Sequence, residues 1–398
     1  MVSVHWTSPT GETHLAGRLD EVGPARLQRF TYDSSWLAGP GFSLGEGLPP
    51  VSGPLLPPGG TTEFGVFLDA GPDAWGRRVI ARKLRPAPRG GTGYLLAAAD
   101  QTREGALRFS DTPDGDFLSD GGPEPVAQLD ELHREVRAFQ EDRDSPGGFA
   151  RLLRAGTSQG GFRPKAAVID EGGGLWIAKF PSETDTYDVE TCEAAALAVA
   201  RDAGLAVPEF RLVRVDPDRA ILLVRRFDRT PMGRFGYQSM RTATRLGPDD
   251  AVDYQMMAAT AGFHSGSAGV RGVVGLAALN LAINNIDDHS RNAGLLQDGD
   301  GRWTLAPVFD VVPYPGDGEG TPLAPGEDAR SLEGLLDLAW GIPRREVERI
   351  ASRVVGAAVE VYAVARDRFG LDEETAANLE RHRATTVSVP ASLALRPR

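Results

Sequence analysis

The feature that most constrains this chain is a polar stretch, residues 284–292 (NNIDDHSRN), that directly follows an apolar segment, residues 272–283. The apolar segment predicts a helix that is buried on most sides. Two short strands are predicted around residues 298–301, and Phe309 and Asp310 follow them. If these residues have no catalytic or binding role, the region is simply the polar end of a helix followed by a hairpin.

The spacing of polar residues in this region predicts a site for phosphoryl transfer. Asp287 precedes Asn292 by five positions, and Asp310 comes shortly after the two predicted strands. In protein kinases a catalytic-loop Asp and a metal-binding Asn have this spacing, and a second metal-binding Asp lies further on. We therefore expect Asp287 to accept the proton of the attacking hydroxyl. Asn292 and Asp310 are expected to bind Mg²⁺, which prefers carboxylate and carbonyl oxygens.

His289 and Asp288 are two other residues of this stretch that could act in the site. His289 is placed with the ATP-binding residues and is expected to orient the loop by hydrogen bonds, because the six histidines show no second His at metal-ligand spacing. Asp288 is either a second acid in the site or a solvated loop residue, and we interpret it as solvated.

Lysine is scarce in this chain, where forty of the 43 basic residues are arginine and the three lysines are Lys83, Lys165 and Lys179. Lysine is a compact point charge and arginine a planar fork, so a retained lysine is a candidate for a role that arginine cannot fill. Lys179 ends the predicted strand 175–180. We expect it to bind the α- and β-phosphates of ATP and to pair with Glu193, with Glu190 as the alternative partner. The simpler interpretation is a strand-edge lysine with a surface partner.

A glycine-rich segment, residues 155–165, leads into a predicted hairpin that ends at Lys179. Glycines let backbone amides approach phosphates closely, so Gly160, Gly161 and Lys165 are predicted to bind ATP. Taken alone this signal is weak, since the chain has 48 glycines.

Residues 221–229 run from a buried strand into a charged link and have the position of a kinase hinge. Arg226 and Phe227 are therefore predicted to lie at the adenine. The alternative is an ordinary strand end with an Arg–Asp pair.

The predicted fold is α+β: a two-lobed, protein-kinase-like fold with an additional N-terminal α/β subdomain. We expect three parts: an N-terminal subdomain, a β-rich N-lobe with the glycine-rich loop, and a helical C-lobe with the catalytic loop, at residues 1–145, 146–230 and 231–398. Within the first part, residues 64–69 are predicted as a strand, and residues 74–83 and 129–139 as helices.

Composition indicates a soluble globular protein, with 41% hydrophobic and 25% charged residues among 398. No apolar run approaches the ~20 residues that span a bilayer. Cys192 is the only cysteine and the N-terminus lacks a secretory pattern, so a cytoplasmic location is expected. The net charge of −12 argues against DNA binding through the overall field of the chain.

Several of these motifs together resemble the HipA family, serine/threonine kinases that act as toxins of HipBA-type toxin–antitoxin modules. The resemblance spans about residues 20–370. It is specific in the Asp-x-His-x-x-Asn stretch and the later Pro-x-Phe-Asp, and softer in the N-terminal part. The segments that carry it are residues 157–165, 177–181, 226–229, 285–292 and 306–310, with 67–77 in addition.

The resemblance implies a kinase-like fold, ATP with Mg²⁺ as cofactors, and protein serine as the phosphate acceptor. Known members act on aminoacyl-tRNA synthetases. Their partner is a small helix-turn-helix antitoxin, HipB, so DNA would be bound only indirectly, and no membrane is implied. Members also autophosphorylate a serine of their own glycine-rich loop, which Ser158 matches, with Thr157 adjacent. The loop here carries Arg163 and Pro164 where the best-known member has an acidic residue.

Three alternatives to a serine/threonine protein kinase are considered. The same fold could transfer phosphate to a small molecule or a lipid headgroup. The chain could instead be a non-catalytic, nucleotide-sensing partner of a DNA-binding antitoxin, although no expected catalytic position is missing. Metal-dependent phosphoester hydrolysis at residues 287–289 is disfavoured, because a two-metal site needs further His and Asp ligands.

Overall fold

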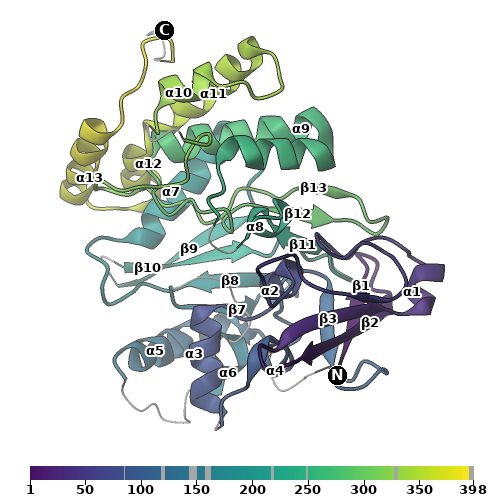
Figure 1. The fold of residues 1–398 in the computed structure, drawn as a ribbon. Helices are drawn as coiled ribbons and strands as arrows, with labels where there is room; N and C mark the ends of the chain where they lie inside the picture. The colour runs from purple at the N-terminus through teal and green to yellow at the C-terminus, as the bar shows by residue number, and fades with distance from the viewer. Residues whose placement is uncertain are drawn as a thin grey trace.

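Figure 1 shows the fold in a computed structural model, which describes residues 1–84, 86–117, 122–142, 150–156, 163–216, 219–247, 250–326 and 330–393. Within these residues the strands form two five-stranded sheets and one three-stranded sheet. Among the helices of the same residues, none is long and apolar enough to cross a membrane.

The first sheet comes from the start of the chain and is antiparallel. Its strands lie in the order β4-β3-β2-β1-β5. Their bounds are β1 Val2–Thr7, β2 Thr13–Val22, β3 Leu27–Tyr32, β4 Pro54–Leu55 and β5 Leu107–Ser110. Aromatic rings fill the core under this sheet: Phe67 meets Phe30 and Phe109 edge to face, with 5.5 and 5.9 Å between ring centroids. A short helix, α1 (Ser34–Ala38), follows β3.

The strand predicted at residues 64–69 is wrong, because the chain forms helix α2 (Gly65–Asp69) there. Val66 and Phe67 are both buried, although they are neighbours in sequence. A half-buried strand would place them on opposite faces, whereas a helix packed on two sides buries both. A run this short does not distinguish strand from helix by periodicity.

The second sheet lies at the centre of the molecule, in the order β6-β7-β8-β10-β9. Its strands are β6 Glu124–Pro125, β7 Lys165–Ile169, β8 Leu175–Lys179, β9 Phe210–Asp216 and β10 Arg219–Arg225. The predicted hairpin of β7 and β8 is present, with Lys165 opposite Lys179. Asp170 closes its turn by accepting hydrogen bonds from the amides of Gly172 and Gly174.

Both faces of the central sheet are covered by helices, as Figure 1 shows. On one face lie α3 (Ala74–Lys83), α5 (Leu129–Gln140) and α6 (Ala150–Ala155), and on the other α7 (Val189–Asp202). Strand β10 shows why: Ile221 and Leu223 join the core of the first face, while Leu222 and Val224 join that of the second. Helices from both sides of residue 145 thus share one core, and the boundary at that residue stays a prediction.

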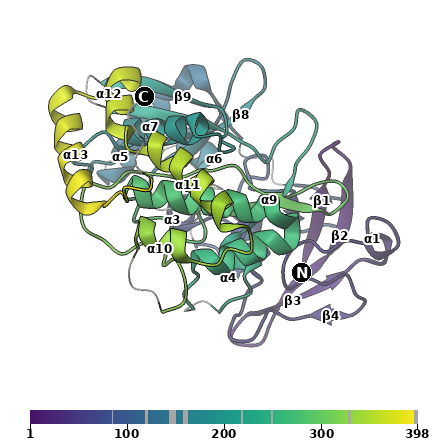
Figure 2. The ribbon, with the colours of Figure 1, turned by 90° about the horizontal axis from the view of Figure 1, so that it is seen from above.

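The rest of the chain forms a mainly helical lobe around a small sheet with the order β11-β12-β13. The strands are β11 Gly236–Ser239, β12 Gly294–Gln297 and β13 Trp303–Leu305, and the helices are α8 Met240–Ala243, α9 Tyr254–Ala282, α10 Leu332–Asp337, α11 Arg344–Ala358, α12 Val361–Phe369 and α13 Glu373–Thr386. Helix α9 is kinked at Gly266. Figure 2 shows α11 and α12 next to α7, with the strands of the first sheet to one side. Residues 283–293 join α9 to β12 and carry the predicted catalytic loop.

Candidate active site

Lys179, the last residue of β8, joins three elements through its ammonium group. Its Nζ lies 2.5 Å from Oε1 of Glu193 on α7 and 2.5 Å from Oδ1 of Asp310. The Lys179 side chain is 12% exposed and that of Glu193 is 4% exposed. One lysine therefore holds the central sheet, α7 and the segment that follows β13 together.

The charges of these three groups are set by opposing effects. Burial would lower the pKa of Lys179, but the carboxylates of Asp310 and Glu193 outweigh burial and raise it. Burial would raise the pKa of Asp310, but Lys179 and Lys165 hold it well below its usual value. For Glu193 burial wins and its pKa is raised, although Lys179 opposes this. Lys179 and Asp310 are thus a charged pair at neutral pH.

Asp287 lies on the loop between α9 and β12, and its side chain is 83% exposed. His289 Nε2 lies 3.7 Å from Asp287 Oδ1. Across the loop, Asn292 Nδ2 donates to the backbone carbonyl of Asp287 at 2.7 Å. Desolvation by the surrounding protein raises the pKa of Asp287, against the effect of His289. The carboxylate is therefore open to an incoming group while its backbone is fixed by Asn292.

The interpretation of Asp288 as a solvated loop residue is wrong, because its side chain is fully buried. Tyr254 Oη donates to its carboxylate at 2.5 Å, Arg330 Nη2 at 2.6 Å and the amide of Thr321 at 2.7 Å. Neighbouring residues of a loop can point in opposite directions, and the sequence pattern alone does not say which of two aspartates points inward. Arg330 and Tyr254 lie far from the motif in sequence and carried no signal of their own.

The side-chain oxygens of Asp310 and Asn292 suit a hard divalent cation. Asp310 has a backbone φ of 56°, in the left-handed region that few non-glycine residues adopt, so its position is specified by its surroundings. Asn292 donates through Nδ2 to Asp287, which leaves its amide oxygen as a possible ligand. In the described part of the chain no group of three or more His, Cys, Asp or Glu side chains could hold a metal ion. Two protein oxygens fit Mg²⁺, which keeps several waters and binds substrate phosphates.

Of the glycine-rich segment, the structure describes the two ends, residues 155–156 and 163–165. The predicted residues Thr157, Ser158, Gly160 and Gly161 lie outside the described residues. Lys165, at the start of β7, is buried and accepts a hydrogen bond on its backbone oxygen from Trp75 Nε1 at 3.1 Å.

Arg163, just before β7, contacts Glu190, one of the two candidate glutamates of α7. It donates to Asp185 at 2.6 and 2.7 Å and to Glu190 Oε1 at 2.8 Å. Glu190 is therefore engaged by Arg163, while Glu193 contacts Lys179.

At the predicted hinge, Arg226 and Phe227 have different surroundings. The guanidinium of Arg226 donates to Asp228 Oδ1 at 2.7 Å and to the backbone oxygen of Thr102 at 2.9 Å. An Arg–Asp pair at an ordinary strand end was the alternative interpretation of this segment, and the side chain of Arg226 forms such a pair. The ring of Phe227 lies 5.4 Å from that of Phe309, next to Asp310. Phe227 thus lies beside the site, while the Arg226 side chain connects the hinge to the N-terminal part.

A family model described as "HipA-like C-terminal domain" matches residues 157–362, which is more than half of the chain. The chain belongs to this HipA-like family. No curated protein matches it.

Two solved structures are similar to this HipA-like chain. In a complex of HipA, HipB and operator DNA from Shewanella oneidensis, a chain with 17% identity has a TM-score of 0.69, and the match covers 97% of this chain and 96% of that one. A Helicobacter pylori proinflammatory kinase, CtkA, has 14% identity and a TM-score of 0.45, covering 57% of this chain and 88% of that one. The first match shows that the expected two-lobed, kinase-like fold with an added N-terminal part is present.

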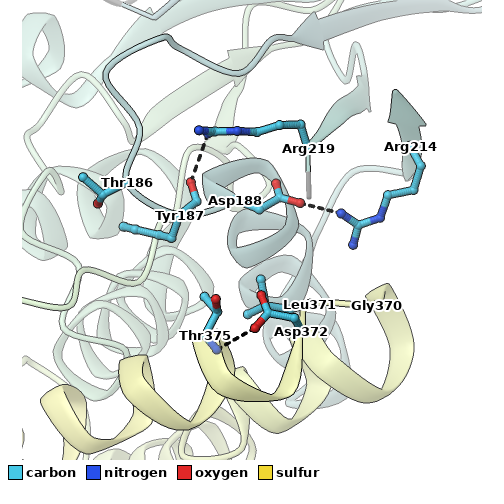
Figure 3. A pocket seen from close by; sticks show the side chains of 9 residues that line it. All are labelled: Thr186, Tyr187, Asp188, Arg214, Arg219, Gly370, Leu371, Asp372 and Thr375. Atoms are coloured by element: carbon cyan, nitrogen blue, oxygen red, sulfur yellow. Dashed lines mark hydrogen bonds and ion pairs between the residues drawn. The ribbon is translucent and has the colours of Figure 1, made fainter. Parts of the chain in front are cut away.

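A pocket of about 190 Å³ in this HipA-like chain lies at the start of α7 (Figure 3). It is lined by Thr186, Tyr187, Asp188, Arg214, Arg219, Gly370, Leu371, Asp372 and Thr375. Arg214 donates to Asp188 at 2.6 Å, and Arg219 donates to the backbone oxygen of Asp185 at 3.0 Å. These contacts join β9 and β10 to the start of α7 and the residues just before it. None of the lining residues was predicted as a site residue.

Proposed function

We propose that this protein is an ATP- and Mg²⁺-dependent phosphotransferase that phosphorylates serine or threonine hydroxyls of proteins. The observation that carries the proposal is the bridge from Lys179 to both Glu193 and Asp310. The loop of Asp287 and Asn292 lies close enough to this bridge for the charge of Asp310 to affect the pKa of Asp287. A lysine held by a helix carboxylate, next to a metal-binding aspartate, is the arrangement that protein kinases use at the phosphates of ATP.

Each residue has one role in this proposal. Lys179 binds the phosphates, and Glu193 fixes its position. Asp287 accepts the proton of the attacking hydroxyl, which its exposed carboxylate can reach. Asn292 and Asp310 would hold Mg²⁺, which when bound neutralises charge on the phosphates. Lys165, Phe227 and His289 would line the nucleotide, with Gly160 and Gly161 at its phosphates.

The exposure of Asp287 supports a large acceptor. Its side chain is 83% exposed, so a serine or threonine on another protein can reach it without entering an enclosed pocket. An aminoacyl-tRNA synthetase is one candidate acceptor. Autophosphorylation is proposed at Ser158, or at Thr157 beside it.

We also propose that the chain is the toxin of a HipBA-like toxin–antitoxin system. The support is its family and its fold, which it shares with a chain solved in complex with HipB and operator DNA. The net charge of −12 suits a protein that reaches DNA only through a HipB-like, helix-turn-helix partner.

The deciding experiment compares the purified wild type with Asp287→Ala. We expect the variant to bind Mg-ATP with unchanged affinity and to lose transfer by about 10²–10⁴-fold, the usual contribution of a general base. Asp300→Ala is the matched control, because Asp300 is an exposed carboxylate on the β12–β13 turn. Transfer by Asp287→Ala at the wild-type rate would contradict the assignment.

Mass spectrometry of the same proteins distinguishes the acceptor classes. Phosphate on Ser158 or Thr157 in the wild type, absent from Asp287→Ala, supports a protein kinase. ATP turnover that requires an added small molecule or lipid, with no phosphorylated peptide, would favour the small-molecule alternative.

A further inference from the structure

Asp288 makes strong hydrogen bonds and an ion pair to residues outside its own loop. Its side chain is 0% exposed, and its three partners lie at the start of α9 (Tyr254), in the segment after Asp310 (Thr321) and before α10 (Arg330). Hydrogen bonds to an ionised group are about twice as strong as those between neutral groups, and removing one partner of a buried ion pair leaves an uncompensated charge. The Asp288 carboxylate therefore connects three separate parts of the helical lobe.

A second layer of hydrogen bonds leads from Asp288 to the backbone of Asp287. Asn280 donates to Tyr254 Oη at 2.7 Å, and Asn285 donates to Asn280 at 3.1 Å. The side-chain oxygen of Asn285 then accepts from the amide of Asp287 at 3.2 Å. The network thus ends at the residue whose carboxylate is the proposed proton acceptor.

The segment after Asp310 contacts both the carboxylate and the backbone of Asp288. Thr321 Oγ1 donates to the backbone oxygen of Asp288 at 2.7 Å, in addition to its amide bond to the carboxylate. A Cβ on Gly320 would lie 2.5 Å from Asp288 Oδ1, closer than real Cβ atoms approach. Glycine at this position lets the segment lie directly on the carboxylate.

We propose that Asp288 is a positioning residue that fixes the segment of residues 311–326 against the loop of Asp287, with Arg330 as its counter-charge. The proposal rests on the proposed phosphotransfer function. Protein kinases commonly order the segment after the metal-binding Asp through contacts between arginine and a phosphate added to that segment. Here Thr321 of the segment donates to Asp288, and Arg330 balances the charge of that carboxylate, so these contacts hold the segment without an added phosphate.

The first test is Asp288→Asn, which keeps the volume of the side chain but removes its charge and one acceptor. We expect kcat to fall by about 10²-fold, because a small misplacement of a site has this effect. The dissociation constant for Mg-ADP should stay unchanged. Hydrogen exchange of residues 311–326 should become faster. The control is Asp300→Asn, which removes an exposed carboxylate paired with Arg302 at 3.0 Å.

A double-mutant cycle with Arg330→Gln tests the pair itself. If both residues act through one contact, the double variant loses little more than either single variant, whereas independent effects would add. An Asp288→Asn protein with wild-type kcat and wild-type exchange would overturn the proposal. So would equal losses of kcat and of Mg-ADP affinity. If Asp288→Asn does not fold, Tyr254→Phe removes one hydrogen bond from the same carboxylate and carries the same expectation.

A further test asks whether phosphorylation of residues 311–326 is needed for activity. It uses protein in which mass spectrometry finds no phosphate on these residues. This protein should transfer phosphate at the full rate, and a requirement for phosphate on Tyr314 or Thr321 would contradict the proposal. Hydrogen exchange also separates the two hypotheses. If the wild type transfers no phosphate, the proposed function fails, while faster exchange of residues 311–326 in Asp288→Asn would still support the positioning role.

Discussion

At the scale of single residues, the strongest electrostatic feature of the site is one buried ammonium group between two carboxylates. Lys179 contacts Glu193 and Asp310, and Lys165 lies opposite it in the register of the β7–β8 hairpin. A buried ion pair adds little net stability when complete, but removing one partner leaves an uncompensated charge. The stability of the folded chain should therefore depend on Lys179, apart from any role of this residue with ATP.

Lys179→Met should destabilise the protein by about 3–5 kcal/mol at pH 7, the usual cost of removing one partner of a buried pair. The loss should be smaller at pH 5, because burial already raises the pKa of Glu193 and its carboxyl can then take up a proton. Urea unfolding at the two pH values measures this. As a control, Arg302→Met breaks an exposed pair and should cost about 0–1 kcal/mol. Equal effects of the two variants would contradict the prediction.

The pair Asp287 and Asp288 shows what sequence patterns predict about a site and what they do not. The spacing of Asp287 and Asn292 places both on the loop between α9 and β12, where Asn292 donates to the backbone oxygen of Asp287. That Asp310, which follows β13, acts with them in one site stays a prediction. The spacing did not predict the burial of Asp288, because burial depends on Tyr254, Thr321 and Arg330 from distant segments. Tertiary partners of this kind leave no local pattern.

At the scale of elements, the first turns of α7 carry two buried glutamates with different partners. Glu193 contacts Lys179 on β8, while Glu190 accepts from Arg163, a residue of the glycine-rich segment. The second carboxylate oxygen of Glu190 is buried and has no hydrogen-bond partner among the residues that the structure describes. Burial raises the pKa of Glu190 to about 7, although Arg163 opposes this. The contact between Arg163 and α7 should therefore depend on pH.

Glu190→Gln tests this pH dependence. Between the ordinary value of 4.5 and the folded value of about 7, the folded chain binds more protons at Glu190 than the unfolded chain does. The contribution of Glu190 to stability therefore falls as pH rises through this window. The variant lacks this loss, so its free energy of unfolding relative to wild type should rise from pH 4.5 to 7, by about 3 kcal/mol at most. Urea unfolding across the window measures it, and a constant difference would refute the prediction.

The elements also show where periodicity is informative. The β7–β8 hairpin was predicted with nearly its observed bounds, because alternating residues and a glycine turn specify both strands and their register. Helix α2 was missed because five residues hold too little of either period. Its conformation is set by contacts that the sequence does not show, including two hydrogen bonds from Ser239 to Asp69, at 2.8 and 2.9 Å.

At the scale of the whole molecule, buried charges join the N-terminal part to the hinge. Asp228 accepts from Arg226 and Arg229, and the amide of Gly105 donates to it at 2.7 Å. Arg226 in turn donates to the backbone oxygens of Thr102 and Arg103. Burial would raise the pKa of Asp228, but the two arginines hold it well below its usual value. The N-terminal part is thus attached at the predicted hinge, and we expect its position to affect the site.

Asp228→Asn should loosen this attachment, because it leaves two buried guanidinium groups without their carboxylate. We expect a loss of about 3–5 kcal/mol in stability, and faster hydrogen exchange in residues 100–110 and 226–234. Asp300→Asn, which removes an exposed carboxylate paired with an arginine, should change neither quantity appreciably. Wild-type exchange in both segments of Asp228→Asn would mean that apolar contacts alone hold the N-terminal part in place. If the charges hold it, transfer activity should fall together with the loss of protection, since the hinge carries Phe227 beside Phe309 and Asp310.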